Sequence, residues 1–251
     1  MTPETTGGEH GLDTLAADGG QDMLRSLGVS QSATESVIDQ LAVFHKSLVR
    51  HLLKKGMGHT AFKSCPLGEI PVSWDVRSLG EVASLTSGKT KPKDSSHLRS
   101  RSHSVPIYGG NGLLGFTVNA LRKGSTIIVG RIGARCGAVH FVSDEESWIT
   151  DNALFVYEMR SELDLRFLYY SLCHLGLSSL RNAGRQPLIS LATIYPLLLA
   201  VPPLAEQREI SNVLLCLETL MKAQDMVLGQ TKKLRSMLLS AATGHAAGSH
   251  Q

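Results

Sequence analysis

The sequence predicts an α+β protein in which one mixed α/β domain is flanked by long coiled-coil helices. Two observations favour this fold class. Apolar residues recur every three or four positions near both ends of the chain, which is typical of amphipathic helices. Between these segments, short apolar runs alternate with turns rich in Gly, Asn and Ser, as in β-strands. A chain of 251 residues is long enough to bury one substantial core.

The N-terminal part predicts a tail followed by a helix. Residues 1–33 are rich in Gly, Thr, Asp and Ser and show no periodicity, which favours a disordered acidic tail. An amphipathic helix is expected over 34–58, where apolar residues recur at helical spacing and Gly56 or Gly58 suits a C-terminal cap. The apolar residues of this helix are Val37, Leu41, Phe44 and Leu48.

Residues 59–203 predict the central globular domain. The runs Thr126–Gly130 and Ala153–Tyr157 are β-branched and aromatic, which is typical of buried strands. Leu163–Leu180 favours a helix that packs on the resulting sheet. About 140 residues suffice for a separate hydrophobic core.

The segment 204–241 predicts a long coiled-coil helix, and 242–251 a flexible tail. Residues three and four positions apart form one stripe, in which two polar residues interrupt the apolar ones. Such a stripe needs another long helix, and the expected helix 34–58 covers only part of it. We therefore expect it to bind a second copy or another subunit. Its members are Ile210, Val213, Leu217, Leu220, Gln224, Val227, Thr231, Leu234 and Leu238.

The charge distribution indicates a polyanionic partner. Residues 41–135 hold fifteen Lys and Arg against four Asp and Glu, which favours binding to nucleic acid and leaves a merely solvated basic face as the alternative. No apolar run is long enough to span a membrane, so we expect a cytoplasmic protein. The four cysteines form no close pair, and we expect no metal site.

Candidate DNA-binding residues fall into two groups. Cations on a polar segment suit phosphate contacts, whereas Arg and Gln beside glycine turns have the hydrogen-bonding groups that recognise guanine and adenine. The alternatives are a flexible solvated loop for the first group and purely architectural glycines for the second. The first group is Lys89, Lys91, Lys93, Arg99 and Arg101, and the second is Arg131, Arg135, Arg185 and Gln186.

Catalysis by the chain itself is not expected. Ala83–Thr90 fits a relaxed phosphate-binding loop, but Pro92 follows at once and prevents the helix that such a loop requires. The Pro-Pro pair in Val201–Leu204 lacks the amide or acid and the aromatic side chain that hold a flipped base. The alternative function is a stand-alone DNA-modifying enzyme with a divergent site.

Several motifs, taken in order, resemble a known family over about residues 35–241. They are Lys55–Lys63, Leu67–Val76, Leu79–Ala83, Ser87–Thr90, Pro106–Gly112, Gly130–Gly133 with Gly137, Trp148–Ala153, Gln186–Ser190 and Val201–Ile210. The chain resembles the specificity subunits of type I restriction-modification systems, in a half-length form with one target-recognition domain. The resemblance leaves open a natural half-subunit that dimerises and a C-terminal remnant of a split gene.

The resemblance implies a protein that binds DNA and carries no cofactor. Its expected partners are double-stranded DNA, methyltransferase subunits and, where the system also cleaves DNA, a restriction subunit. S-adenosylmethionine is expected in the partner methyltransferase, which methylates adenine within a two-part target.

Overall fold

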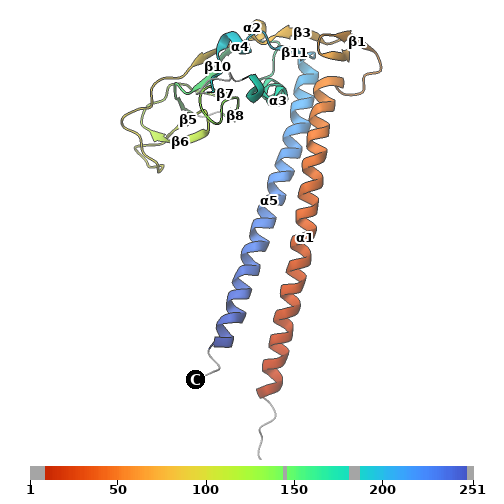
Figure 1. The fold of residues 1–251 in the computed structure, drawn as a ribbon, viewed down its shortest axis with the longest axis vertical. Coiled ribbons are helices and arrows are strands. Elements are labelled where there is room, and N and C mark those ends of the chain that lie inside the picture. Colours follow the sequence, from red (N-terminus) through yellow and green to blue (C-terminus); the bar gives the residue numbers. More distant parts are fainter. Residues whose placement is uncertain (1–8, 144–145, 181–186, 248–251) are drawn as a thin grey trace, which may run out of the picture. The chain divides into compact units, whose positions relative to one another are not determined.

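The structure is a computed structural model that describes residues 9–143, 146–180 and 187–247. The chain divides into two compact units (Figure 1). We call Met1–Ser47 with Leu215–Gln251 the helical unit, and Leu48–Leu214 the globular unit. Helices α1 (Glu9–Lys55) and α5 (Leu204–Ala247) each contribute residues to both units.

In the helical unit, α1 and α5 lie side by side and antiparallel (Figure 1). Lys232 of α5 forms an ion pair of 2.9 Å with Glu35, and Arg235, further along α5, hydrogen-bonds to Gln31, which precedes Glu35 on α1 (3.3 Å). The hydrogen bond from Lys232 is the largest cause that lowers the pKa of Glu35, followed by the one from Gln31.

Both long helices extend beyond their expected ends. The predicted disordered tail 1–33 is wrong from Glu9 onward, because α1 begins there, and α5 runs to Ala247 through part of the predicted tail 242–251. Residues 1–8 and 248–251 lie outside the described residues. The predicted end of the first helix is confirmed, since α1 stops at Lys55 and Gly56 has a positive φ of 65°. Since α1 is longer than expected, it covers more of α5 than the sequence indicated.

Four strands form the central antiparallel sheet of the globular unit, in the order β4-β10-β7-β8. They are β4 (Ala83–Ser87), β10 (Ala153–Met159), β7 (Thr126–Gly130) and β8 (Val139–Val142). The predicted strands at 126–130 and 153–157 are therefore confirmed. Every residue of β7 is buried, which explains the apolar run Ile127–Val129 at its centre.

A second sheet has the order β6-β5-β9, and two strand pairs complete the unit. The second sheet contains β5 (Val105–Gly109), β6 (Gly112–Thr117) and β9 (Trp148–Ile149). The pairs are β1 (Phe62–Cys65) with β2 (Gly68–Pro71), and β3 (Asp75–Ser78) with β11 (Leu198–Val201).

Helix α3 (Leu165–Leu175) covers part of the central sheet, contacting β7 and β8. Phe167, Leu168 and Leu172 are buried in the core cluster that also contains residues of β7 and β10. The Asp164 carboxylate caps its start by accepting from the Phe167 N–H at 2.8 Å. The helix ends earlier than the predicted Leu180, because Gly176 takes a left-handed conformation. A short 3₁₀ helix (Leu177–Leu180) follows, and the small helices α2 (Leu79–Val82) and α4 (Leu191–Ile194) lie in connections.

The Glu206 carboxylate, near the start of α5, joins this helix to the segment that follows α1 and to Trp74, which precedes β3. One oxygen is 2.7 Å from His59 Nε2 and accepts from the Met57 N–H at 3.2 Å, while the other accepts from Trp74 Nε1 at 2.9 Å. Trp74 is fully buried. Gly56 leaves the necessary space, because a Cβ at this position would collide with the same carboxylate. The motifs at 55–63, 67–76 and 201–210 therefore meet at one residue.

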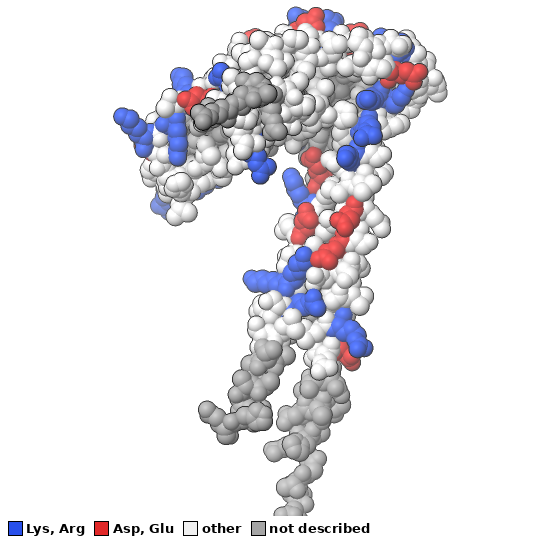
Figure 2. Space-filling model, in the orientation of Figure 1, with Lys and Arg blue, Asp and Glu red and all other residues white. Residues whose placement is uncertain are grey.

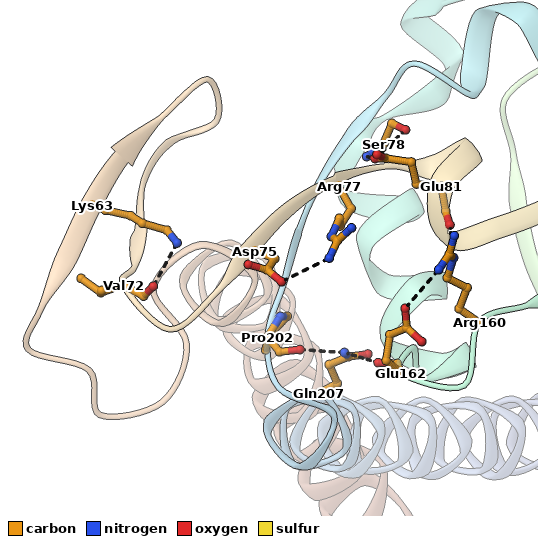
Figure 3. A network of polar contacts seen from close by, with 10 residues as sticks. All are labelled: Lys63, Val72, Asp75, Arg77, Ser78, Glu81, Arg160, Glu162, Pro202 and Gln207. Carbon is orange, nitrogen blue, oxygen red and sulfur yellow. Dashed lines mark hydrogen bonds and ion pairs between the residues drawn. The ribbon is translucent and has the colours of Figure 1, made fainter.

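The neighbouring side chain, Gln207, joins the start of α5 to the segment between β10 and α3 (Figure 3). It is fully buried, and its amide nitrogen donates to the carbonyls of Glu162 (2.9 Å) and Pro202 (2.8 Å). Its amide oxygen accepts from the Asp164 N–H at 2.8 Å. An apolar residue at 207 would leave these three backbone groups without this partner, and the bond to the buried Pro202 would be the most costly to lose.

We expect Glu206→Ala to destabilise the protein more than the loss of a single hydrogen bond does. The substitution leaves Trp74 Nε1 and His59 without their acceptor, at a cost of about 3 kcal/mol in the free energy of unfolding, whereas Trp74→Phe removes one donor at about 1 kcal/mol. Urea unfolding followed by circular dichroism measures both. Glu209→Ala is the matched control. Glu209 is exposed and lies three residues further along α5, so its replacement should change the stability little. Equal effects of Glu206→Ala and Glu209→Ala would contradict this account of the junction.

Candidate nucleic-acid interface

Five of the sequence motifs meet in one region of the globular unit, which we call the hub. It comprises Ser87–Thr90, Tyr108–Gly112, Gly130–Gly133, Trp148–Ala153 and Pro187–Ile189. Backbone hydrogen bonds join these segments in a chain. The Lys89 N–H donates to the Ile149 carbonyl (2.9 Å), and the Thr150 N–H donates to the Tyr108 carbonyl (2.8 Å). The Arg131 N–H donates to the Asn152 carbonyl, and the Arg131 carbonyl accepts from the Ile189 N–H, both at 2.9 Å.

Glycines allow the hub to be this compact. A Cβ on Gly88 would collide with the carbonyl oxygens of Ile149 and Thr150. A Cβ on Gly110 would lie 2.9 Å from the Asn152 carbonyl oxygen, and one on Gly130 would lie 2.6 Å from the Gly110 carbonyl oxygen. The backbones pack directly against each other, so we infer a rigid platform whose shape depends on residues without side chains.

Arg131 belongs to the interior of the hub rather than projecting from it as expected. Its side chain is half-buried, and Nη1 donates to Ser87 Oγ at 3.2 Å. Among the described residues, its buried Nε has no hydrogen-bond partner. Arg135, by contrast, is exposed on the loop that follows. The two arginines that the sequence grouped together therefore have different environments.

The cations of the first predicted group lie on one exposed segment. Lys89, Lys91 and Lys93 leave the end of β4, and Arg99 and Arg101 lie on the loop that leads to β5; all five are exposed. Figure 2 shows Lys and Arg side chains at the end of the globular unit that carries β5 and β6. Arg185 and Gln186 lie outside the described residues. Their contact with DNA, like that of the other candidates, stays a prediction.

Two cations of the basic segment 41–135 already form hydrogen bonds or an ion pair within the protein. The Arg122 guanidinium donates to the carbonyls of Tyr157 (3.3 Å) and Ser125 (3.2 Å) and lies over the Phe155 ring. Burial lowers its pKa. Lys123 forms an ion pair of 2.6 Å with Glu146, and this hydrogen bond raises the lysine pKa. Net charge alone therefore overstates the number of cations that are free to meet phosphates.

Polar side chains of the hub were not singled out by sequence reasoning. Asn111, at the turn between β5 and β6, and the adjacent Asp151 and Asn152 are exposed, and Asp151 Oδ2 accepts from Thr90 Oγ1 at 3.5 Å. Amide and carboxylate groups can pair with adenine and cytosine in the major groove. The motifs that contain them were visible in the sequence, but only the fold places Asp151 beside Lys89, whose carbonyl accepts from the Asp151 N–H at 3.1 Å.

The predicted interface stripe of α5 is divided between two faces. Ile210 is buried, and Leu217, Gln224, Thr231 and Leu238 are half-buried. The other four members are more exposed, namely Val213 (36%), Leu220 (47%), Val227 (48%) and Leu234 (48%). In place of these four, the half-buried positions on α5 include Met221, Leu228 and Arg235. Own-chain packing thus occupies about half of the stripe.

Two further observations concern metal ligands and membrane spans in the described part of the chain. It contains no group of three or more His, Cys, Asp or Glu side chains placed to hold a metal ion. None of its helices is both long and apolar enough to cross a membrane.

Comparison with known proteins identifies the family. A sequence model described as the type I restriction modification DNA specificity domain matches residues 71–225. The chain belongs to this family. It is 25% identical over 145 residues to the specificity subunit of the type I restriction enzyme EcoprrI from Escherichia coli, a match that covers 57% of this chain and 36% of that protein. The resemblance seen in the sequence motifs is confirmed.

Solved structures of specificity subunits share the fold. The S subunit of a type I restriction-modification system from M. genitalium matches with a TM-score of 0.58 at 16% identity, over 90% of this chain and 58% of that one. The HsdS subunit from Thermoanaerobacter tengcongensis matches with a TM-score of 0.61 at 16% identity, over 90% and 56%. The expected α+β class with long helices is confirmed. The chain spans about a third of the curated relative's length and less than two thirds of the solved chains.

We expect Lys91→Ala to weaken DNA binding equally for all sequences. A lysine that contacts a phosphate contributes to affinity through the release of counterions, so its loss should reduce the slope of log K against log salt by about 1. Fluorescence anisotropy with duplexes of unrelated sequence, titrated at several salt concentrations, measures this slope. Lys123→Ala is the matched control, because Glu146 already neutralises that charge. An unchanged slope for Lys91→Ala would show that Lys91 does not contact a phosphate.

Proposed function

We propose that this chain reads DNA sequence for a type I restriction-modification system and directs an adenine methyltransferase to a two-part target. The observation that carries the proposal is the hub. It unites five separate motifs of a specificity-family chain into one rigid platform bordered by exposed cations. Phosphate contacts from such cations would set the register of the duplex, while neighbouring side chains would read the bases. We place this activity in the cytoplasm, as the sequence composition predicts.

We propose further that methyl transfer belongs to the partner subunit, which would bind S-adenosylmethionine. The phosphate-loop-like segment of this chain supports the division. Strand β4 does precede Gly88, which the sequence did not predict, but Lys89 instead pairs with Thr150 as an isolated bridge. No helix begins after Thr90, so the amide groups that would hold a nucleotide phosphate are not presented.

We expect the purified chain to show neither methylation nor cleavage of DNA. Co-expression with its methyltransferase subunit should produce sequence-specific adenine methylation, since only the complex would combine recognition with a cofactor site. Sequencing that detects methylated adenine, applied to cells with and without this gene, measures the outcome and yields the target. Methyl transfer by the chain alone would favour the alternative, a stand-alone DNA-modifying enzyme with a divergent site.

The helical unit has an apolar face suited to binding other helices. The ion pair between Glu35 and Lys232 marks one flank of the α1–α5 pair. At 100° per residue, Val37 and Leu234 each lie about 160° around their own helix from these charges. They therefore lie on the opposite flank, with Phe44, Leu220 and Val227 in line at seven-residue intervals. All five side chains are at least 43% exposed. Apolar surface in such continuous rows indicates an interaction site.

We propose that a second copy of the chain covers this face. Two helix pairs joined face to face form a four-helix bundle, in which a two-fold axis brings identical rows together. Two recognition domains related by that axis would read identical half-sites in opposite orientation, about one helical turn or 34–36 Å apart. A methyltransferase subunit and, in a system that cleaves DNA, a restriction subunit would complete the assembly.

We expect Leu220→Lys with Val227→Lys to abolish self-association and methylation in cells. Both side chains are exposed, so the changes place like charges in the interface while the helix pair stays folded. Asp225→Lys with Ser236→Lys is the matched control, because these exposed positions lie toward the charged flank. Light scattering of the complex with the methyltransferase subunit counts the copies, and circular dichroism checks folding. A single copy per complex would rule out the dimer.

A further inference from the structure

The loop between β4 and β5 is anchored to β6 through Asp94 and Ser96. Ser96 and Phe116 of β6 exchange two backbone hydrogen bonds of 2.8 and 2.7 Å. The hydroxyl of Thr117, which is fully buried, donates to Asp94 at 3.3 Å. Gly115 permits the close approach, since a Cβ there would lie 2.5 Å from the Ser96 carbonyl oxygen. The position of this loop is therefore fixed by the second sheet.

Two residues beyond this anchor, the chain exposes a large apolar side chain. Leu98 is 79% exposed, more than any other large apolar side chain among the described residues. Its backbone is held on both sides, because the Leu98 N–H donates to Ser96 Oγ (3.1 Å) and that hydroxyl donates to the Leu98 carbonyl (2.9 Å). These bonds hold the main chain, so the leucine side chain is displayed in a defined place without burial.

The surroundings of Leu98 restrict what it can bind. His97, Arg99 and Arg101 are exposed beside it, and the segment from Lys89 to His103 holds five Lys and Arg against the single acid Asp94. An apolar group within so basic a segment fits a polyanion that itself offers an apolar contact. Duplex DNA does so in its major groove, where the C5-methyl group of thymine contacts apolar side chains.

We propose that Leu98 is a specificity-determining residue that contacts the methyl group of a thymine in the target. The inference rests on the proposed DNA-reading function. Arg99 and Arg101 would hold this loop against the DNA phosphate backbone or pair with a neighbouring guanine. The target then contains at least one A·T pair at which the methyl group, and not only the hydrogen-bonding pattern, is recognised.

Replacing thymine by uracil tests this contact, because uracil keeps every hydrogen-bonding group and lacks only the methyl. The complex of the full chain with its methyltransferase subunit is titrated with duplexes of the target found by sequencing methylated DNA, each carrying one deoxyuridine. One substitution should weaken binding by about fourfold, as expected for one apolar group of this size. Leu98→Ala should weaken binding to the thymine duplex by a similar factor. The Leu98→Ala complex should then bind the thymine and uracil duplexes equally well.

Control variants separate this contact from other roles of the loop. Val72→Ala removes a similarly exposed apolar group (53%) outside the basic segment and should bind as the unmodified chain does. Leu98→Met, which keeps an apolar side chain of similar reach, should retain sensitivity to the methyl group. Since Leu98 is scarcely buried, none of these changes removes core packing.

The outcomes distinguish the two levels of the proposal. If the unmodified complex methylates no specific sequence, the proposed function fails. If it does so but no uracil substitution depends on Leu98, the inference about Leu98 alone is overturned. Loss of binding on Leu98→Ala that is equal for thymine and uracil duplexes also overturns it, and would point to insertion between base pairs or to a protein contact.

Discussion

The globular unit depends on two adjacent side chains at the start of α5. Glu206 binds His59, Trp74 and the Met57 N–H, and Gln207 binds backbone groups at 162, 164 and 202. These partners lie between residues 57 and 74 and between 162 and 202, so two side chains on one helical turn join segments that are far apart in the sequence. Hydrogen bonds to a charged acceptor are stronger than neutral ones, and buried polar groups must be paired. A single pair of residues therefore fixes the start of α5 within the globular unit.

The same domain separates the glycine positions that hold its backbone from the exposed side chains at its border. In the hub, backbone packs on backbone at Gly88, Gly110 and Gly130, where even a methyl group would collide. Such positions cannot exchange side chains without moving the strands, so they hold the platform and carry no sequence information. At its border, by contrast, Lys89, Lys91, Lys93 and Arg101 are exposed. A protein that must keep one fold while its target differs would place base contacts on residues of the second kind.

The sequence predicted the globular unit better than the helical unit, for physical reasons. Strand β7 was located because all five of its residues are buried and its centre, Ile127–Val129, is apolar and β-branched. The start of α1 was missed because Gly19, Gly20 and Gly28 are poor helix formers, and a helix of this kind is stabilised by its partner more than by local propensity. The glycine motifs marked the hub, but their mutual contacts join segments far apart in sequence. Periodicity could not place Arg131 in the interior, since an arginine beside glycines is equally compatible with exposure.

The division of the α5 stripe follows from a third apolar row that the sequence also contains. Leu217 and its heptad equivalents are buried or half-buried, as are Met221 and Leu228 of the neighbouring row. The row of Leu220, Val227 and Leu234 stays exposed. A two-stranded coiled coil needs only two rows, and spacing alone does not say which two of three will be used. The exposed row of Leu220, Val227 and Leu234 is not used within the helix pair and, left in water, lowers solubility. One helix with three apolar rows is therefore suited to two interfaces at once, an internal one with α1 and an external one on the same helical unit.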